Sequence, residues 1–178
     1  MICRRFIISQ ILVLIHRGVL SRWASRFQAE TSMRHFGVHQ QLICMFFAQL
    51  TWRDGLRDIV ECLNAKPEAV YHLGFWETVA KSTLGDANQR RDWRLREALA
   101  LRLIPKSRSV YAGEDLGLDL EHTIYALDST MIDLSLTMFP WATFRSSKSG
   151  IKVHTQIDLR GPIPVCVFVS PARMHDVE

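Results

Sequence analysis

The chain has 178 residues, of which 48% are hydrophobic and 22% are charged. This is the composition of a globular protein, and it excludes a disordered chain, a collagen-like repeat and a disulfide-rich scaffold. The formal net charge of +4 is unevenly placed, because residues 1–111 hold 17 basic and 9 acidic side chains whereas residues 112–178 hold 5 and 9. A basic first part and an acidic second part suggest one surface that attracts a polyanion and one site that carries carboxylates.

An apolar run near the N-terminus, residues 6–15, superficially copies a signal peptide. Ser9 and Gln10 interrupt this run, His16 and Arg17 end it, and no small-residue cleavage site follows. The run is also shorter than the roughly 20 apolar residues that span a bilayer. We therefore expect a buried amphipathic helix and no membrane segment. Four separated cysteines without a Cys-x-x-Cys pair predict reduced thiols in a cytoplasmic protein.

The first hundred residues are predicted to be helical. A helix is expected over 38–50, where apolar residues recur at helical spacing. Residues 51–54, with a hydroxyl at the first position and a carboxylate at the last, have the form of a capping box and predict that the next helix begins there. That helix would contain Gly55 in its interior, at a cost on the order of 1 kcal/mol relative to Ala. Its apolar stripe would consist of Leu56, Ile59, Val60 and Leu63, with Asn64 and Pro67 closing it.

Thr83 and Asp86 repeat the capping pattern and predict one further helix that Pro105 ends. This helix carries several arginines near an asparagine and a glutamine. Asn88, Arg91 and Arg94 are our candidate DNA contacts, because guanidinium and amide groups pair with phosphates and with base edges. A solvated cationic helix face is the alternative interpretation.

From residue 123 the pattern changes to strands. Strand-like stretches cover 123–132, 151–159 and 165–169, and a turn rich in Gly and Pro separates the last two. We therefore expect an α+β protein whose first three strands form an antiparallel meander. Lys148 and Lys152 could contact phosphate near this sheet, although a solvated hairpin is the simpler interpretation.

Asp128 stands in the middle of the first apolar strand. An aspartate that is buried there is costly unless it is paired or holds a metal ion. Its oxygen ligands would favour Mg²⁺ or Mn²⁺, but phosphoryl transfer by two ions needs several converging carboxylates. The alternative is an aspartate at a strand end, where the chain turns into a loop through Ser129 and Thr130.

Short stretches that match a known protein family follow one another in the same order along nearly the whole chain. They are Ala48-Gln49-Leu50, Leu56-Arg57-Asp58-Ile59, Tyr71-His72-Leu73-Gly74, Ser82-Thr83-Leu84, Asp86-Ala87-Asn88, Arg91-Asp92-Trp93-Arg94, Tyr125-Ala126-Leu127-Asp128-Ser129-Thr130, Phe139-Pro140-Trp141-Ala142, Ile151-Lys152-Val153-His154-Thr155, Asp158-Leu159-Arg160-Gly161, Ile163-Pro164 and His175-Asp176-Val177. With these stretches the chain resembles the IS4-type insertion-sequence transposases, which carry an N-terminal helical domain of the DUF4372 kind ahead of a DDE, RNase H-like catalytic domain.

The resemblance implies a helical DNA-binding domain over 1–111, a linker over 112–122, and the start of an RNase H-like catalytic domain over 123–178. Asp128 would be the first catalytic carboxylate and a ligand of Mg²⁺ or Mn²⁺. The implied function is transposition of an insertion sequence, a form of DNA recombination. The implied partners are terminal inverted repeats, target DNA, and a second copy or a full-length transposase, in the bacterial cytoplasm at the nucleoid.

The second aspartate and the glutamate of the family's triad are expected beyond residue 178. We therefore expect metal-dependent strand cleavage and transfer in the full-length family and not in this chain by itself. One alternative is a non-catalytic DNA-binding protein or an inhibitor of full-length transposase. Another is an unrelated small metal-dependent nuclease that uses Asp128, Asp176 and Glu178.

Overall fold

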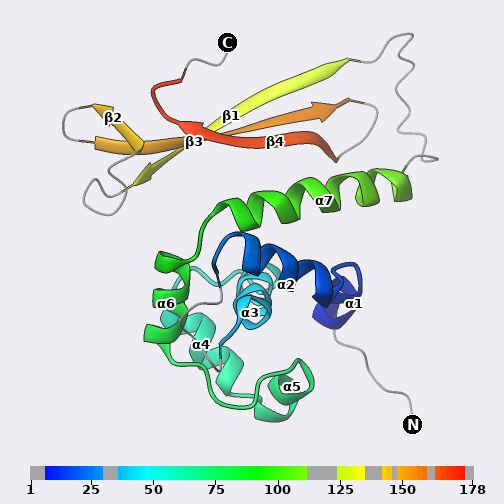
Figure 1. Cartoon of the computed structure of the whole chain (residues 1–178), viewed down its shortest axis with the longest axis vertical. Helices are drawn as coiled ribbons and strands as arrows, with labels where there is room; N and C mark the ends of the chain where they lie inside the picture. The colour runs from blue at the N-terminus through cyan, green and yellow to red at the C-terminus, as the bar shows by residue number, and fades with distance from the viewer. Residues whose placement is uncertain are drawn as a thin grey trace. The chain divides into compact units, whose positions relative to one another are not determined.

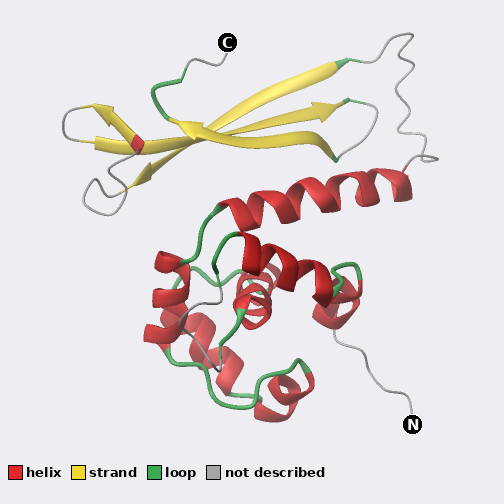
Figure 2. Ribbon diagram, in the orientation of Figure 1, coloured by secondary structure: helices red, strands yellow, loops and turns green. Residues whose placement is uncertain are grey.

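The computed structural model describes residues 7–29, 36–111, 124–134, 142–145, 148–159 and 163–174 (Figure 1). Within these ranges the chain forms seven helices and then four strands, so the expected α+β class is confirmed (Figure 2). The chain divides into two compact units, residues 1–95 and residues 96–178. The expected linker over 112–122 lies outside the described residues, and the domain boundary placed there stays a prediction.

The first unit is built around one central helix. Its elements are α1 (Ile7–Val13), α2 (Arg17–Arg26), α3 (Val38–Leu50), α4 (Leu56–Asn64), α5 (Pro67–His72) and α6 (Lys81–Arg90). Helix α3 contacts α1, α2, α4 and α6. It has the predicted bounds, because its apolar residues occupy most of its circumference and can be buried by neighbours on several sides.

Two clusters of buried side chains hold this unit together. The apolar stripe predicted for α4 contributes Ile59, Val60 and Leu63, and burial of each such side chain stabilises the fold by about 1.5–3 kcal/mol. The larger cluster comprises Ile8, Phe36, Ile43, Cys44, Ala48, Ile59, Val60, Leu63, Val70, Leu73, Phe75, Val79, Leu84 and Ala87. The smaller cluster comprises Ala24, Ala29, Val38 and Leu95, with Phe27 packed against it.

The predicted capping box at residues 51–54 is wrong. Thr51 ends α3, and its Oγ1 donates a hydrogen bond to the Phe47 carbonyl at 2.6 Å. The chain then turns through Trp52, which has a positive φ of 54°, and the Arg53 N–H donates to the Ala48 carbonyl at 2.9 Å. These bonds satisfy the last carbonyls of α3, so the same residues cannot begin α4. Gly55 is therefore the N-cap of α4, in an extended conformation, and not a residue of its interior.

The single helix predicted after Thr83 is also wrong. The chain forms α6 and then α7 (Arg94–Tyr111), and it leaves the helical conformation at Arg91. Pro105 lies inside α7 and does not end it. An internal proline costs roughly 3 kcal/mol when judged locally. Contacts offset that cost, because Ile104 is buried before the proline and Arg108 after it forms an ion pair with Asp158.

The second unit contains one antiparallel sheet. Its strands are β1 (Tyr125–Leu134), β2 (Thr143–Arg145), β3 (Lys148–Asp158) and β4 (Pro164–Pro171). Strand β3 lies in the middle, with β1 paired along one edge and with β2 and β4 paired along the other. The three expected strands are β1, β3 and β4, and their antiparallel pairing is confirmed. The short strand β2 was not predicted.

The polar side chains of β3 lie on the more buried face of the sheet. His154 is 2% exposed, its Nε2 lies 2.8 Å from Ser170 Oγ, and its ring stacks on Phe168 at 4.3 Å between centroids. Asp158, on the same face because side chains alternate along a strand, accepts a hydrogen bond from Arg108 Nη2 of α7 at 3.1 Å. The opposite face carries Val153, Thr155 and Ile157, which are only half-buried.

Two sequence-based expectations concern membrane segments and the state of the cysteines. No helix in the described ranges is both long and apolar enough to cross a membrane. Cys44, Cys62 and Cys166 are free thiols, and burial raises the pKa of the Cys44 thiol to about 12. A thiol with so high a pKa is almost entirely protonated at neutral pH and is therefore unreactive.

Candidate nucleic-acid interface

Arg91, one of the predicted DNA contacts, lies in the interior of the helical unit. Its Nε donates to the Ala29 carbonyl at 3.1 Å, and its Nη1 donates to the Gly37 carbonyl at 3.1 Å and to Gln41 Oε1 at 2.9 Å. Its Nη2 donates to the carbonyl of Phe36, and the guanidinium also lies over the Phe36 ring, 5.7 Å from the centroid. Arg91 therefore joins the end of α6 to the chain around the start of α3 and offers no open fork to a phosphate.

Asn88, a second predicted contact, belongs to the same internal network. Its Oδ1 accepts a hydrogen bond from Gln41 Nε2 at 2.6 Å, and its Nδ2 lies 3.8 Å from Met45 Sδ. Gln41 thus bonds Asn88 through its amide nitrogen and Arg91 through its amide oxygen. The three side chains form one polar bridge between α3 and the end of α6. Their polar groups are therefore bonded to one another inside the unit.

The other predicted contacts are on the surface or partly described. Arg94 is exposed, and its guanidinium pairs with Asp92, with Nε 2.9 Å from Oδ2. Lys152 donates from Nζ to the Met174 carbonyl at 2.9 Å. Lys148 begins β3, and its side chain lies outside the described part of the chain. Arg94 and Lys152 are each already bonded to another residue of this protein, so a DNA phosphate would have to compete with that residue.

Asp128 lies in β1 directly opposite Thr155, and its side chain is exposed rather than buried. Thr130 Oγ1 donates to its Oδ2 at 3.4 Å. Asp128 is thus neither buried nor at a strand end among the described residues, because β1 continues to Leu134 and is an edge strand there. Asp133, five positions along the same strand, lies on the opposite face and cannot share a ligand with Asp128.

The described donors do not make a metal site. Nowhere in the described ranges do three His, Cys, Asp or Glu side chains come together in a way that could hold an ion. Asp128 supplies one carboxylate, whereas a two-ion centre needs several that converge. Asp176 and Glu178, which the nuclease interpretation requires, lie outside the described residues.

Helix α2 carries a cationic face that our sequence interpretation missed. Leu20 and Ala24 are buried, whereas Arg17, Ser21, Arg22, Ser25 and Arg26 are exposed. Among the described residues no carboxylate forms an ion pair with these three arginines. A signal was present in the sequence, because residues 1–53 contain seven arginines and the single acidic residue Glu30. Exposed guanidinium groups beside serine hydroxyls are suited to phosphate oxygens.

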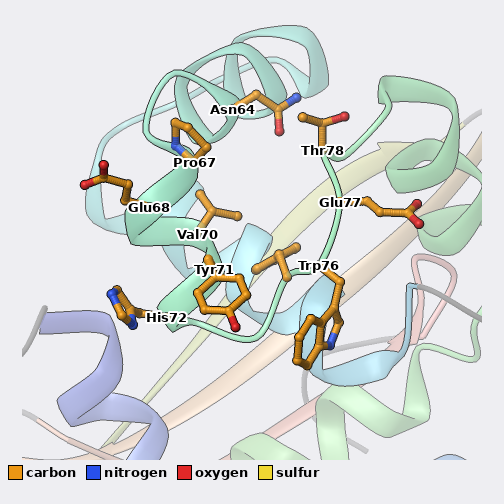
Figure 3. Close-up of a pocket in the computed structure, with 10 residues that line it drawn as sticks. Asn64, Pro67, Glu68, Val70, Tyr71, His72, Trp76, Glu77 and Thr78 are labelled. Atoms are coloured by element: carbon orange, nitrogen blue, oxygen red, sulfur yellow. The ribbon is translucent and has the colours of Figure 1, made fainter.

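A groove of about 580 Å³ opens between the end of α4, α5 and the segment that follows α5 (Figure 3). Tyr71 and Trp76 stand at its rim with their rings edge to face, 5.6 Å apart at an angle of 88°. Trp76 is 79% exposed and Tyr71 is 57% exposed, so both rings are largely open to solvent. Val70 and Phe75 line the groove from the buried side.

Trp76 also lines a second, smaller pocket of about 200 Å³ on the same unit. Its other lining residues include Arg17 and Ser21 from α2, and His39 and Gln40 from α3. Burial lowers the pKa of His39, and the nearby charge of Arg17 lowers it further, so both favour the neutral imidazole. Among the described residues, the pocket therefore combines one guanidinium with neutral hydrogen-bonding groups and has no acidic lining residue.

Residues 4–76 match the model of a protein family described as a domain of unknown function, DUF4372. This domain is found in transposase-associated proteins. The matched segment contains α1 to α5 and ends at Trp76, so it includes the α2 face and most of the residues around both pockets. No curated protein and no solved structure matches the chain.

Proposed function

We propose that this protein binds the DNA of an insertion sequence through its helical unit and is related to the IS4-type DDE transposases. The exposed surface of α2 carries the proposal, because its three arginines form no ion pair with an acidic residue of the described ranges and lie within the segment that matches DUF4372. A cationic face of this kind gains affinity for duplex DNA by releasing counterions from the phosphates. The DNA partners are the terminal inverted repeats of the element and its target.

The strand unit supports the same relationship less directly. Asp128 projects from the first strand of an antiparallel sheet, where the resemblance places the first carboxylate of an RNase H-like core. Because the described residues add no second carboxylate there, we assign recognition and not strand cleavage to them. This favours a DNA-binding or inhibitory role for the 178-residue chain. It would act alone, with a second copy, or with a full-length transposase.

The test measures duplex binding by the full chain. Fluorescence anisotropy would follow a labelled duplex that carries the terminal repeat, across a series of salt concentrations. The double variant Arg22→Ala/Arg26→Ala removes two phosphate contacts, so the slope of log K against log salt concentration is expected to fall by about 2. The matched control is Arg53→Ala/Arg90→Ala, which removes two arginines that already pair with Asp58 and Asp86.

Each outcome has one meaning. A lower affinity and a shallower slope in the α2 variant, with the control close to wild type, support the proposal. Equal affinity in the two variants would place binding elsewhere on the molecule. A wild-type chain that does not bind the duplex at low salt would overturn the proposed function.

A further inference from the structure

The groove beside Tyr71 and Trp76 is built from chain segments that are fastened at both ends. At the C-terminal end of α5, the Gly74 N–H donates to the Tyr71 carbonyl at 2.9 Å and the Phe75 N–H donates to the Val70 carbonyl at 3.2 Å. This is a Schellman turn, and Gly74 supplies the positive φ of 95° that it needs. The turn fixes the direction in which the chain continues to Trp76.

The far end of the same segment is held by one side chain of α4. Asn64 donates from Nδ2 to the Val79 carbonyl at 2.9 Å and accepts from the Val79 N–H at 3.0 Å. The four residues between Gly74 and Val79 are thus held by backbone hydrogen bonds at one end and by the Asn64 amide at the other. The groove is therefore formed before any ligand arrives, which reduces the entropic cost of binding.

The chemistry of the groove is aromatic, and that of the adjoining pocket is cationic. Tyr71 and Trp76 present largely exposed rings, while Glu68 and Glu77 direct their carboxylates outward on opposite sides (Figure 3). The smaller pocket, which Trp76 also lines, contains Arg17, whose Nη2 lies 3.5 Å from the point that a Cβ on Gly74 would occupy. A flat ring and a negative charge can thus be accommodated in two pockets that share one tryptophan.

A nucleotide has these two parts, a flat base and a charged phosphate. Its base is a flat π system that stacks on tryptophan and tyrosine whatever its sequence, and its phosphate pairs with a guanidinium. A base inside a duplex is stacked on its neighbours and cannot enter a groove, so the ligand must be unpaired. The volume of about 580 Å³ lies within the range of small-ligand pockets.

We propose that this groove binds one unpaired nucleotide of a DNA strand, with the base stacked on the ring of Trp76, its edge toward Tyr71, and its phosphate held by Arg17. The inference rests on the proposed function and extends it, because it gives the helical unit a preference for DNA that is not fully paired. Duplex DNA is held by Arg22 and Arg26 on α2, whereas the unpaired nucleotide is read at the groove.

The experiment compares two labelled DNAs with the full chain. One is a blunt duplex, and the other is the same duplex with a single unpaired 2-aminopurine nucleotide at its centre. The wild type is expected to bind the second DNA about tenfold more tightly and to quench its 2-aminopurine fluorescence by stacking. Trp76→Ala should remove both the preference and the quenching, and Arg17→Ala should reduce the preference. Trp52→Ala is the matched control, because Trp52 is 91% exposed and lines neither pocket.

Failure of the inference is separable from failure of the proposed function. If the wild type binds both DNAs equally, with binding still dependent on Arg22 and Arg26, the proposed function stands and the nucleotide site is wrong. If Trp52→Ala loses the preference as Trp76→Ala does, the site is also wrong. If the wild type binds neither DNA, both are wrong. Since Trp76 is exposed, the far-UV circular dichroism of Trp76→Ala should equal that of the wild type, which shows that the variant is folded.

Discussion

Arg91 Nη1 and Gln41 Oε1 are joined by a hydrogen bond of 2.9 Å, although 50 residues separate them in the sequence. Arg91 makes further hydrogen bonds to the carbonyls of Ala29, Phe36 and Gly37, so one guanidinium satisfies acceptors on both sides of the gap between α2 and α3. The bridge explains why an arginine that sequence reasoning assigned to DNA is 8% exposed.

The first prediction follows from this bridge. Arg91→Lys should destabilise the helical unit by about 3 kcal/mol, because an ammonium group cannot reach all these acceptors and the buried carbonyls left unpaired cost roughly 1–3 kcal/mol each. Urea unfolding followed by far-UV circular dichroism measures the loss. Arg94→Lys is the control, since that exposed pair with Asp92 is worth at most about 1 kcal/mol. Similar losses in the two variants would show that Arg91 is not the bridge described.

The second prediction concerns the start of α4. Gly55 is its N-cap, in an extended conformation with φ −121° and ψ 145°, and a Cβ added there would meet nothing within 4 Å. Gly55→Ser should therefore stabilise the unit by about 0.5 kcal/mol, because serine caps the helix and restricts the unfolded chain. The measurement is the shift in urea midpoint.

Gly37, the N-cap of α3, is the matched control for this substitution. A Cβ there would lie 3.0 Å from Gln40 Oε1, and Gln40 is held by its bond to the Gly74 carbonyl at 3.1 Å. Gly37→Ser should consequently gain less than Gly55→Ser. The opposite order would contradict the assignment of Gly55 as an open N-cap.

The third prediction concerns pH. Burial and the neighbouring charge of Arg17 lower the pKa of His39 below its model-compound value of 6.5. In the window between that value and the lowered pKa, the unfolded chain binds a proton that the folded chain does not, so stability falls as the pH drops below 6.5. The loss stops growing below the folded-state pKa.

His39→Gln should remove this contribution. The difference between the urea midpoints at about pH 7.5 and about pH 5.5 is then expected to be smaller in the variant than in the wild type. His72→Gln serves as the comparison, because His72 lines the aromatic groove and not the pocket of Arg17. An unchanged difference in His39→Gln would exclude His39 as a source of the pH dependence.

The fourth prediction concerns catalysis. The 178-residue chain should not nick supercoiled DNA that carries the terminal repeats in Mg²⁺ or Mn²⁺, because one exposed carboxylate at Asp128 cannot position two ions. Asp128→Ala should behave as the wild type does, both in this assay and in duplex binding. Metal-dependent nicking that disappears in Asp128→Ala would overturn this prediction and favour the nuclease interpretation.

Much of the local structure could be predicted from hydrophobic spacing. The bounds of α3, the buried stripe of α4 and the three longer strands follow from periods of 3.6 and 2 residues. Helix starts could not be predicted as well, since residues 51–54 and Thr83 have the composition of capping boxes. Thr51, in the first of these sites, bonds to the preceding helix, and α6 begins at Lys81, two residues before Thr83, with Ala80 as its N-cap.

The candidate site divides in the same way. The sequence by itself determined the excess of arginine in the first part of the chain and the place of Asp128 in a strand. Only the tertiary structure decided which arginines are available, because a guanidinium in a helical sequence can point to solvent or to carbonyls that lie far away along the chain. It buried Arg91 among such carbonyls, left the arginines of α2 exposed, and brought Trp76 and Arg17 to the lining of one pocket.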